Sequence, residues 1–397
     1  MEQLPHLDPT SLEELVAPHH DELVAVRRDI HRHPELGRAE LRTTELLARR
    51  LAGAGLDPKV LPGGTGLVCD VGVGAPALAL RADLDALPVQ DQKRAPYRST
   101  IPGVCHACGH DVHAAALLGA GLVLAELREA GRLAGATRLV FQPAEELVPG
   151  GALDVIEAGG LDGVERILAL HCDPRLPAGQ VGVRTGPITG AADQILVRLS
   201  GPGGHTARPH LTGDLVYALG TVATQLPAAL SRRVDPRAGL SVVWGRIAAG
   251  SAHNAIPDSG ELLGTLRCMD PVAWEEAPDL VRGLVAALVA PYGVRASVDY
   301  ERGVPPVVND PESCALFTRA GHVALGPDAV VDTEQSLGGE DFAWFLRRVS
   351  GAMARLGVAR PDAHATLDLH QGTFDVDERA ISAGARLFVA AALLAVG

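Results

Sequence analysis

The spacing of apolar residues predicts alternating helices and strands from the start of the chain to about residue 186. A Ser-x-x-Glu capping box at 11–14 begins a helix, and Pro34 ends it. The apolar residues between these points follow helical spacing; they are Leu15, Val16, Leu23, Val24, Val26 and Ile30. Further helices are expected over 39–51, 111–131 and 152–159, and buried strands over 66–72, 77–84, 137–143 and 165–172. This alternation predicts an α/β layer with a largely parallel sheet flanked by helices.

The pattern changes near Gly186 and changes back near Val304. The expected elements between them are a strand at 194–205, a helix at 214–230, strands at 239–251 and 259–270, a helix at 273–293 and a strand at 295–303. This β-α-β-β-α-β order is that of a small α+β sandwich of the ferredoxin-like kind. We therefore predict one domain made of 1–186 and 303–397, with a second domain, 187–302, inserted into it.

The composition is that of a globular protein and narrows the classes of function. The 397 residues are too many for one ordinary core. The formal net charge is −13, and no cluster of Lys and Arg could follow a phosphate backbone, which argues against a nucleic-acid partner. No apolar run reaches the ~18 residues of a membrane span, and the N-terminus lacks a signal-peptide pattern. The six cysteines are scattered, which is not the density of a disulfide scaffold, so we expect a cytoplasmic protein without a membrane partner.

Cysteine, histidine and glutamate residues gather where the predicted strands end. They are Cys108 and His110 in the segment HACGHDVH (106–113), Glu145 and Glu146 after one strand, His171 at the end of the next, and His370 near the C-terminus. Because the carboxyl ends of parallel strands meet at one edge of a sheet, these side chains are expected to share a cleft. Thiolate, imidazole and carboxylate groups together predict a transition-metal site.

Each of these features also has a simpler interpretation. A single histidine such as His171 is more often a hydrogen-bonded core residue, and the pair Glu145 and Glu146 could form a solvated face. Cys105 and Cys108 could be a redox pair or half of a zinc ribbon, although a ribbon needs a second pair that the chain lacks. Other enzyme signatures, such as HExxH, GxSxG, GxGxxG and Walker A, are missing.

Eight motifs, in order along nearly the whole chain, resemble the M20 metallopeptidase family. They are HRHPELGRAE (31–40), LRADLDALPVQD (80–91), HACGHDVHAAALLGA (106–120), FQPAEE (141–146), GGHTARPH (203–210), HNAIPDSGEL (253–262), GTLRCMD (264–270) and GGEDFAWFL (338–346). They are most similar to the branch that hydrolyses N-acyl amino acids, with hippurate hydrolase, aminoacylase and auxin-conjugate hydrolase types. The resemblance implies a dinuclear metal catalytic domain interrupted by a lid or dimerisation domain.

The resemblance also implies roles for individual residues. The implied metal ligands are Cys108, His110, Glu146, His171 and His370, for two divalent ions such as Zn²⁺, Mn²⁺, Co²⁺ or Ni²⁺. Glu145 matches the general base, and Asp85 matches a residue that orients a ligating histidine. In the inserted domain, His205 matches a stabiliser of the oxyanion, while Asn254 and Arg267 match residues that engage the substrate. The implied activity is metal-dependent hydrolysis of the amide bond of a small N-acyl amino acid by a homodimer, releasing a carboxylic acid and a free amino acid.

Two alternatives remain open at this stage. The first is a dipeptidase, carboxypeptidase or deacylase of another M20 branch, but such branches carry H-x-D where this chain has Asp83-Leu-Asp85, and Asp where it has Cys108. The second is a non-catalytic metal- or peptide-binding homologue, whose mark would be the loss of Glu145. The chain departs from its branch at Cys105, where many relatives carry Met. A thiol there could compete for metal or form a disulfide with Cys108.

Overall fold

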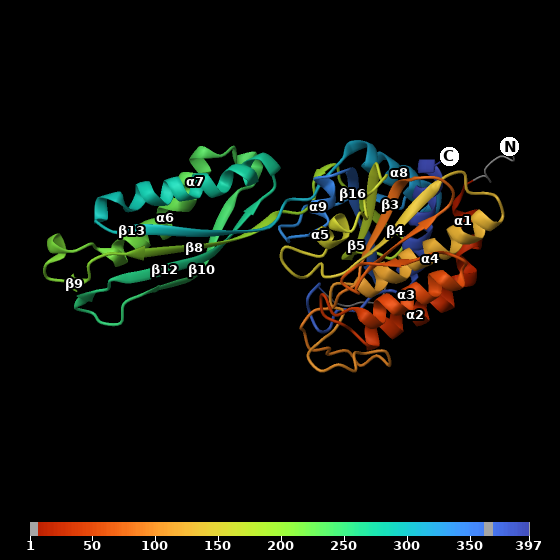
Figure 1. Ribbon diagram of the computed structural model, residues 1–397, viewed down its shortest axis with the longest axis horizontal. Coiled ribbons are helices and arrows are strands. Elements are labelled where there is room, and N and C mark those ends of the chain that lie inside the picture. Colours follow the sequence, from red (N-terminus) through yellow and green to blue (C-terminus); the bar gives the residue numbers. More distant parts are fainter. Residues whose placement is uncertain (1–6, 361–367, 397) are drawn as a thin grey trace. The chain divides into compact units, whose positions relative to one another are not determined.

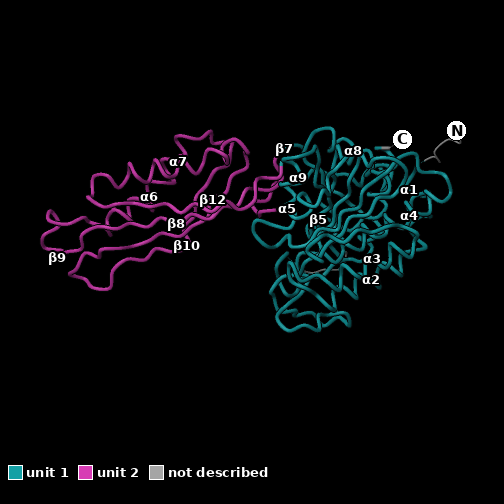
Figure 2. The backbone as a smooth tube through the Cα atoms, in the orientation of Figure 1, with its two compact units in different colours: residues 1–186, 308–334, 341–397 teal, residues 187–307, 335–340 magenta. Residues whose placement is uncertain are grey.

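The computed structural model describes residues 7–360 and 368–396, which form two compact units (Figure 2). Unit 1 comprises Met1–Gly186, Val308–Glu334 and Asp341–Gly397. Unit 2 comprises Pro187–Val307 and Gln335–Glu340. Each unit has its own sheet and its own helices.

The segment Gln335–Glu340 belongs to unit 2, although the sequence pattern placed it with the first domain. The amide of Ser336 donates to the carbonyl of Ile188 at 2.9 Å. The guanidinium of Arg267 donates to the carbonyl of Leu337, also at 2.9 Å. Such contacts between distant residues carry no apolar periodicity, so no sequence pattern could assign the segment. The chain consequently passes between the units four times rather than twice.

The centre of unit 1 is an eight-stranded sheet whose four central strands run parallel to one another. In order across the sheet the strands are β1 (Lys59–Val60), β2 (Leu67–Val71), β4 (Ala136–Gln142), β3 (Pro76–Asp83), β5 (Arg166–Pro177), β16 (Ser350–Ala359), β6 (Val181–Val183) and β15 (Val330–Asp332). Leu80 of β3 lies opposite Leu139 on one side and Leu168 on the other, and all three are fully buried. The predicted α/β fold with a mostly parallel sheet is confirmed.

Helices of unit 1 pack against this sheet (Figure 1). They are α1 (Pro9–Val16), the 3₁₀ turn Ala17–His19, α2 (His20–Arg32), α3 (Leu41–Gly53), α4 (His110–Glu129), α5 (Ala152–Glu157), α8 (Pro311–Leu325), α9 (Ala343–Leu346) and α10 (Arg379–Val396). Helix α4 contacts β3 and β5, whereas α8 and α10 contact β16. Helices and strands thus enclose one continuous apolar core.

Helix α4 is a core helix, and its first residue is one of the predicted metal ligands. Among the described residues it alone is long and apolar enough to cross a membrane by length and composition, but 94% of that apolar window is buried inside the structure. Its glycines allow close packing: a Cβ on Gly119 would lie only 2.5 Å from Cδ1 of Leu23 in α2. The buried helix therefore holds His110 at a rigid, tightly packed position.

The first predicted helix is divided in two and begins earlier than its sequence pattern indicated. Asp8 is the N-cap of α1: its side chain accepts from the amide of Ser11 at 2.8 Å, and the Ser11 hydroxyl accepts from the amide of Asp8 at 3.1 Å. The capping box predicted at 11–14 is therefore wrong, because Ser11 is the last residue of an earlier box. Pro18 has no amide hydrogen, and a 3₁₀ turn around it separates α1 from α2.

Unit 2 is an antiparallel four-stranded sheet, in the order β10-β12-β8-β13, packed against two helices (Figure 1). Its elements are β8 (Ala191–Ser200), β9 (Gly204–His205), a 3₁₀ turn (Pro209–Leu211), α6 (Leu215–Arg233), a 3₁₀ turn (Pro236–Ala238), β10 (Ser241–Ala249), β11 (Ala255–Ile256), β12 (Ser259–Cys268), α7 (Pro271–Val289), a 3₁₀ turn (Ala290–Tyr292) and β13 (Arg295–Val304). The short strands β7 (Gly186–Pro187) and β14 (Val308–Asn309) lie where the chain passes between the units. The main elements follow the predicted β-α-β-β-α-β order.

Candidate metal centre

Cys108 and His110 are presented by a sharp turn at the start of α4. Between them, Gly109 is the N-cap and has a φ of 89°, in the left-handed region that favours glycine. A Cβ at this position would lie 2.6 Å from Sγ of Cys172, so the close approach to β5 also requires glycine. The turn brings both side chains beside the strands, as the sequence spacing predicted.

The structure brings the five predicted ligands together in unit 1. The Sγ atom of Cys108 lies 3.5 Å from Nε2 of His171. Nε2 of His370 lies 3.3 Å from Oε1 of Glu146, and Nε2 of His110 lies 3.9 Å from the same oxygen. His171 does not end its strand as predicted, because β5 continues beside β16 as far as Pro177.

These five side chains form two overlapping sets that share a thiol. One set is Cys108, His110 and His171, and the other is Cys108, Glu146 and His370; within each set the ligand atoms lie within 4.8 Å of one another. The members of the first set are buried, whereas the side chain of His370 is 54% exposed. The arrangement therefore offers two adjacent places for a cation, one deeper than the other.

Histidine protonation in the cluster reflects its surplus of anionic groups. Hydrogen bonds to Cys108 and Glu146 raise the pKa of His370 to about 10. Burial alone would lower the pKa of His110, but Asp83 and Cys108 raise it well above its ordinary value. Burial and the nearby charge of Arg355 hold the pKa of His171 well below its ordinary value. The protons on His110 and His370 thus offset the negative charge of the neighbouring carboxylates and thiol. A bound cation would neutralise the same charge.

Asp85 holds both glutamates of the FQPAEE motif by their backbone. Its two oxygens accept from the amides of Glu145 and Glu146 at 3.0 and 2.9 Å. One of these oxygens also lies 3.3 Å from Nδ1 of His110. Asp85 therefore lies beside a predicted ligand and also fixes the turn that carries the predicted base. Oε2 of Glu145 lies 3.8 Å from Nε2 of His110, which places its carboxylate at the cluster.

A second supporting pair, Asp83 and His113, was missed by sequence reasoning. The amide of Cys172 donates to Nε2 of His113 at 2.8 Å, so this nitrogen carries no proton. Nδ1 must then carry it and donate to Oδ1 of Asp83 at 2.6 Å. The His113 ring stacks on His110, with centroids 5.5 Å apart. The available signal was that His113 follows His110 by three residues and so lies on the same face of a helix.

The remaining predicted residues, His205, Asn254 and Arg267, belong to unit 2. His205 is exposed on β9, and its Nδ1 accepts from the amide of Ala207 at 3.0 Å. The neutral ring therefore carries its proton on Nε2, which can donate. The carbonyl of Asn254 accepts from Thr206 at 3.2 Å, next to the pairing of β9 with β11. Arg267 uses Nη1 to hold the carbonyl of Leu337.

The cysteines give no sign of a redox pair or a zinc ribbon. All six are free thiols and buried. Cys105 packs in a small apolar cluster with Cys108 and Leu87, and burial raises the pKa of its thiol to about 11. It belongs to none of the candidate ligand groups formed by the described residues. Cys105 is thus a packing residue beside the cluster rather than a competing ligand.

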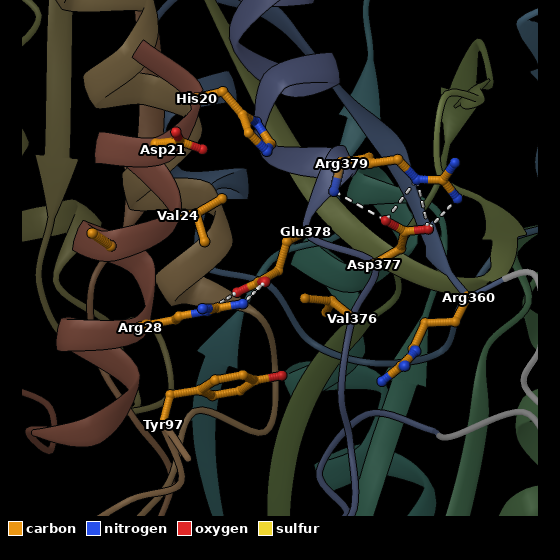
Figure 3. A pocket seen from close by; sticks show the side chains of 11 residues that line it. His20, Asp21, Val24, Arg28, Tyr97, Arg360, Val376, Asp377, Glu378 and Arg379 are labelled. Atoms are coloured by element: carbon orange, nitrogen blue, oxygen red, sulfur yellow. Dashed lines mark hydrogen bonds and ion pairs between the residues drawn. The ribbon is translucent and has the colours of Figure 1, made fainter. Parts of the chain in front are cut away.

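A separate cavity of unit 1, of about 950 Å³, lies between α2, Tyr97 and the start of α10 (Figure 3). Its lining carries three arginines and three acidic residues, and two ion pairs lie within it: Arg28 with Glu378, and Arg379 with Asp377 (Figure 3). A lining with balanced charges favours no particular ligand charge. The chemistry of unit 1 is therefore concentrated at the cluster around Cys108 and His110.

Comparisons with known proteins find similarity along most of the chain. The model of peptidase family M20/M25/M40 matches residues 79–394. A relative from Bacillus subtilis (strain 168), named N-acetyl-L-cysteine deacetylase, is 36% identical over 362 residues, covering 91% of this chain and 85% of the relative. A relative from Rhodococcus jostii (strain RHA1), named putative glutamate–cysteine ligase 2-3, is 52% identical over 370 residues, or 93% of this chain. The chain spans only 46% of the length of that second relative.

One solved structure has the same fold and a related sequence. It is a Bacillus subtilis protein described as a dinuclear metal binding peptidase from the M20 family. It is 31% identical to this chain, covers 96% of it, and superposes with a TM-score of 0.83 over 99% of its own length. The similarity therefore extends over both units and includes the strands that carry the cluster.

Proposed function

The chain belongs to peptidase family M20/M25/M40 and is an amidohydrolase, and from this premise we propose that it cleaves the amide bond of N-acyl amino acids. The products are a carboxylic acid and a free amino acid. The observation that carries the proposal is the cluster of Cys108, His110, Glu146, His171 and His370, with Glu145 beside it. A second candidate is peptide cleavage, because a Saccharolobus solfataricus relative that is 35% identical is named thermostable carboxypeptidase 1.

The cluster suits two divalent ions held by those five ligands. Both ring nitrogens of His110 are buried without a hydrogen bond of normal geometry, which is costly unless a cation or proton is bound. Thiolate, imidazole and carboxylate donors suit Zn²⁺, Co²⁺, Ni²⁺ or Mn²⁺. When bound, such ions lower the pKa of water and polarise a carbonyl group. Cys108 belongs to both ligand sets, so its thiol could hold either ion.

The chain's own residues supply the proton transfers and the orientation. Glu145 takes the proton of the attacking water and passes it to the leaving nitrogen. Nε2 of His205 donates to the oxyanion of the tetrahedral intermediate, since Ala207 occupies Nδ1. Arg267 pairs with the carboxylate of the substrate through its remaining guanidinium nitrogens, and Asn254 binds the substrate next to β9.

The substrate class is tested by turnover of a panel of compounds. N-acetyl, N-benzoyl and indole-acyl amino acids are assayed with added Mn²⁺, Co²⁺ or Zn²⁺, with dipeptides as competitors and the Glu145→Gln chain as a blank. The name of the Bacillus subtilis relative recommends N-acetylcysteine as one member. We expect release of free amino acid from acylated amino acids in preference to dipeptides. Faster cleavage of dipeptides would support the carboxypeptidase alternative, and no turnover of any compound would support a non-catalytic homologue.

We further propose that two chains associate through unit 2. Strand β10 lies at an edge of its sheet and exposes Val243 by 64% and Ile247 by 59%. An exposed apolar edge strand is a template for pairing with another chain. A two-fold dimer would cover this edge. Light scattering, which measures the molecular mass in solution, distinguishes such a dimer from a monomer.

The role of His205 is tested by substitution and by mixing chains. His205→Ala is expected to lower turnover about 10²–10³-fold, the scale for loss of one oxyanion donor. Metal content should not change, because every proposed ligand lies in unit 1. If His205 acts on the partner chain, a heterodimer of His205→Ala with Glu145→Gln should regain activity, since one site then has both residues. No recovery in a verified heterodimer would place its action within one chain, and wild-type turnover in His205→Ala would contradict the role.

A further inference from the structure

Ala144, the residue before the proposed base, has an unusual backbone conformation. Its φ is 54°, which is uncommon and unfavourable for a residue with a Cβ. Ala144 is fully buried, in the turn between β4 and the two glutamates. Residues kept in such conformations persist only where surrounding contacts over-determine them, and they gather at functional sites. Contacts from other parts of the chain must therefore hold this turn.

Two carboxyl groups clamp three successive amides of the turn. Oε1 of Glu40 accepts from the amide of Ala144 at 2.7 Å. Asp85 accepts from the next two amides, those of Glu145 and Glu146. On the opposite side the carbonyl of Ala144 accepts from the amide of Gly151 at 2.9 Å. Every hydrogen bond that fixes the left-handed residue thus comes from outside β4.

Glu40 is a costly residue to place here. Its side chain is fully buried at the N-cap of α3, 104 positions from its partner in the sequence. Burial and the proximity of Asp85 raise the pKa of its carboxyl to about 7. An apolar residue would avoid that cost but would leave the amide of Ala144 buried without an acceptor. The bond to Ala144, together with backbone hydrogen bonds at Arg38 and at Glu40 itself, accounts for a carboxyl group at this position.

We propose that Glu40 is a positioning residue for catalysis, which holds the left-handed turn at Ala144 and thereby directs the carboxylate of Glu145 toward the cluster. This inference rests on the proposed function, in which Glu145 is the general base. In the described part of the chain, the Glu40 carboxyl reaches this turn through the amide of Ala144 and has no hydrogen bond to the side chain of Glu145 or of a proposed ligand, so it acts through the backbone.

The test compares side chains that keep or lose the acceptor. Glu40→Gln keeps an oxygen at the same reach and is expected to retain turnover within a few-fold. Glu40→Leu removes the acceptor, and Glu40→Asp places it one methylene short while remaining a good N-cap for α3. Both are expected to lower kcat about 10–100-fold with little change in KM, because small displacements of a reacting group have effects of this size.

Glu35 provides a matched control. Its carboxylate accepts from the amides of Arg42 and Thr43 at the start of the same helix, but it does not contact the Ala144 turn. Glu35→Leu should lower the melting temperature as much as Glu40→Leu and leave kcat unchanged. Binding of Co²⁺ alone, followed by its absorption spectrum, checks that the ligands remain in place in each variant.

The outcomes separate this inference from the proposed function. Loss of kcat in Glu40→Asp, with rescue in Glu40→Gln, supports the positioning role. Wild-type kcat in Glu40→Asp and Glu40→Leu, or equal loss in Glu40→Gln and Glu35→Leu, overturns it. If Glu145→Gln itself retains full turnover, the assignment of the base fails. If Glu145→Gln is inactive while Glu40→Asp is not, only the inference about Glu40 fails.

Discussion

Replacing Glu145 by glutamine is expected to reduce turnover about 10²–10⁴-fold, the usual contribution of a general base. The amide side chain has the same size but cannot accept the proton of water at neutral pH. The turn should remain intact, because Asp85 and Glu40 hold it through backbone amides that the substitution does not alter. Metal content, measured by elemental analysis, should equal that of the wild type.

The neighbouring glutamate provides the contrast for this experiment. Glu146 lies 3.3 Å from His370 within the second ligand set, so Glu146→Gln should lower metal occupancy before it affects chemistry. Excess metal should therefore restore part of the activity of Glu146→Gln and none of the activity of Glu145→Gln. The opposite pattern would mean that the two residues exchange the roles assigned to them.

Removal of metal is expected to abolish turnover and to lower stability together. Dialysis against a strong chelator should reduce hydrolysis to background, and added Zn²⁺, Mn²⁺ or Co²⁺ should restore it. Since the ligands come from the start of α4, the turn after β4, strand β5 and a turn near the C-terminus, bound ions would join parts of unit 1 that are far apart in the sequence. At a free metal concentration 100 times Kd, binding contributes about 2.7 kcal/mol to stability.

Calorimetry of metal-free and reloaded protein measures this difference. The reloaded chain should unfold at the higher temperature, and the shift should grow with metal concentration. Hydrolysis at the full rate in strong chelator, with no metal detected in the protein, would refute the metal centre.

Local patterns predicted the parts of the site that depend on strand ends. Apolar runs placed β3, β4 and β5 as buried strands, and Glu145 and Glu146 follow β4 as expected. The position of Cys108 and His110 at a helix start could also be read from spacing, because α4 begins at His110. These features are short in sequence, so periodicity and turn residues report them.

Contacts between distant loops could not be predicted in the same way. The hydrogen bond from the amide of Ala144 to Glu40 and the pair of Asp83 and His113 depend on how β3, β4, α3 and α4 pack together. No residue type signals that a buried glutamate will accept from one particular amide. The resemblance to a family indicated which residues form the cluster, whereas only the structure shows which residues hold them.

The four passages of the chain between the units limit how the protein could be recombined with its relatives. A hybrid that took only Pro187–Val307 from another protein would keep the native segment Gln335–Glu340. That segment would then face whichever residue the other protein has at the position of Arg267. The carbonyl of Leu337 and the amide of Ser336 would then have to form their hydrogen bonds with residues of the foreign sequence. Exchange of this domain therefore requires two segments, and the six-residue one has to be transplanted with the larger.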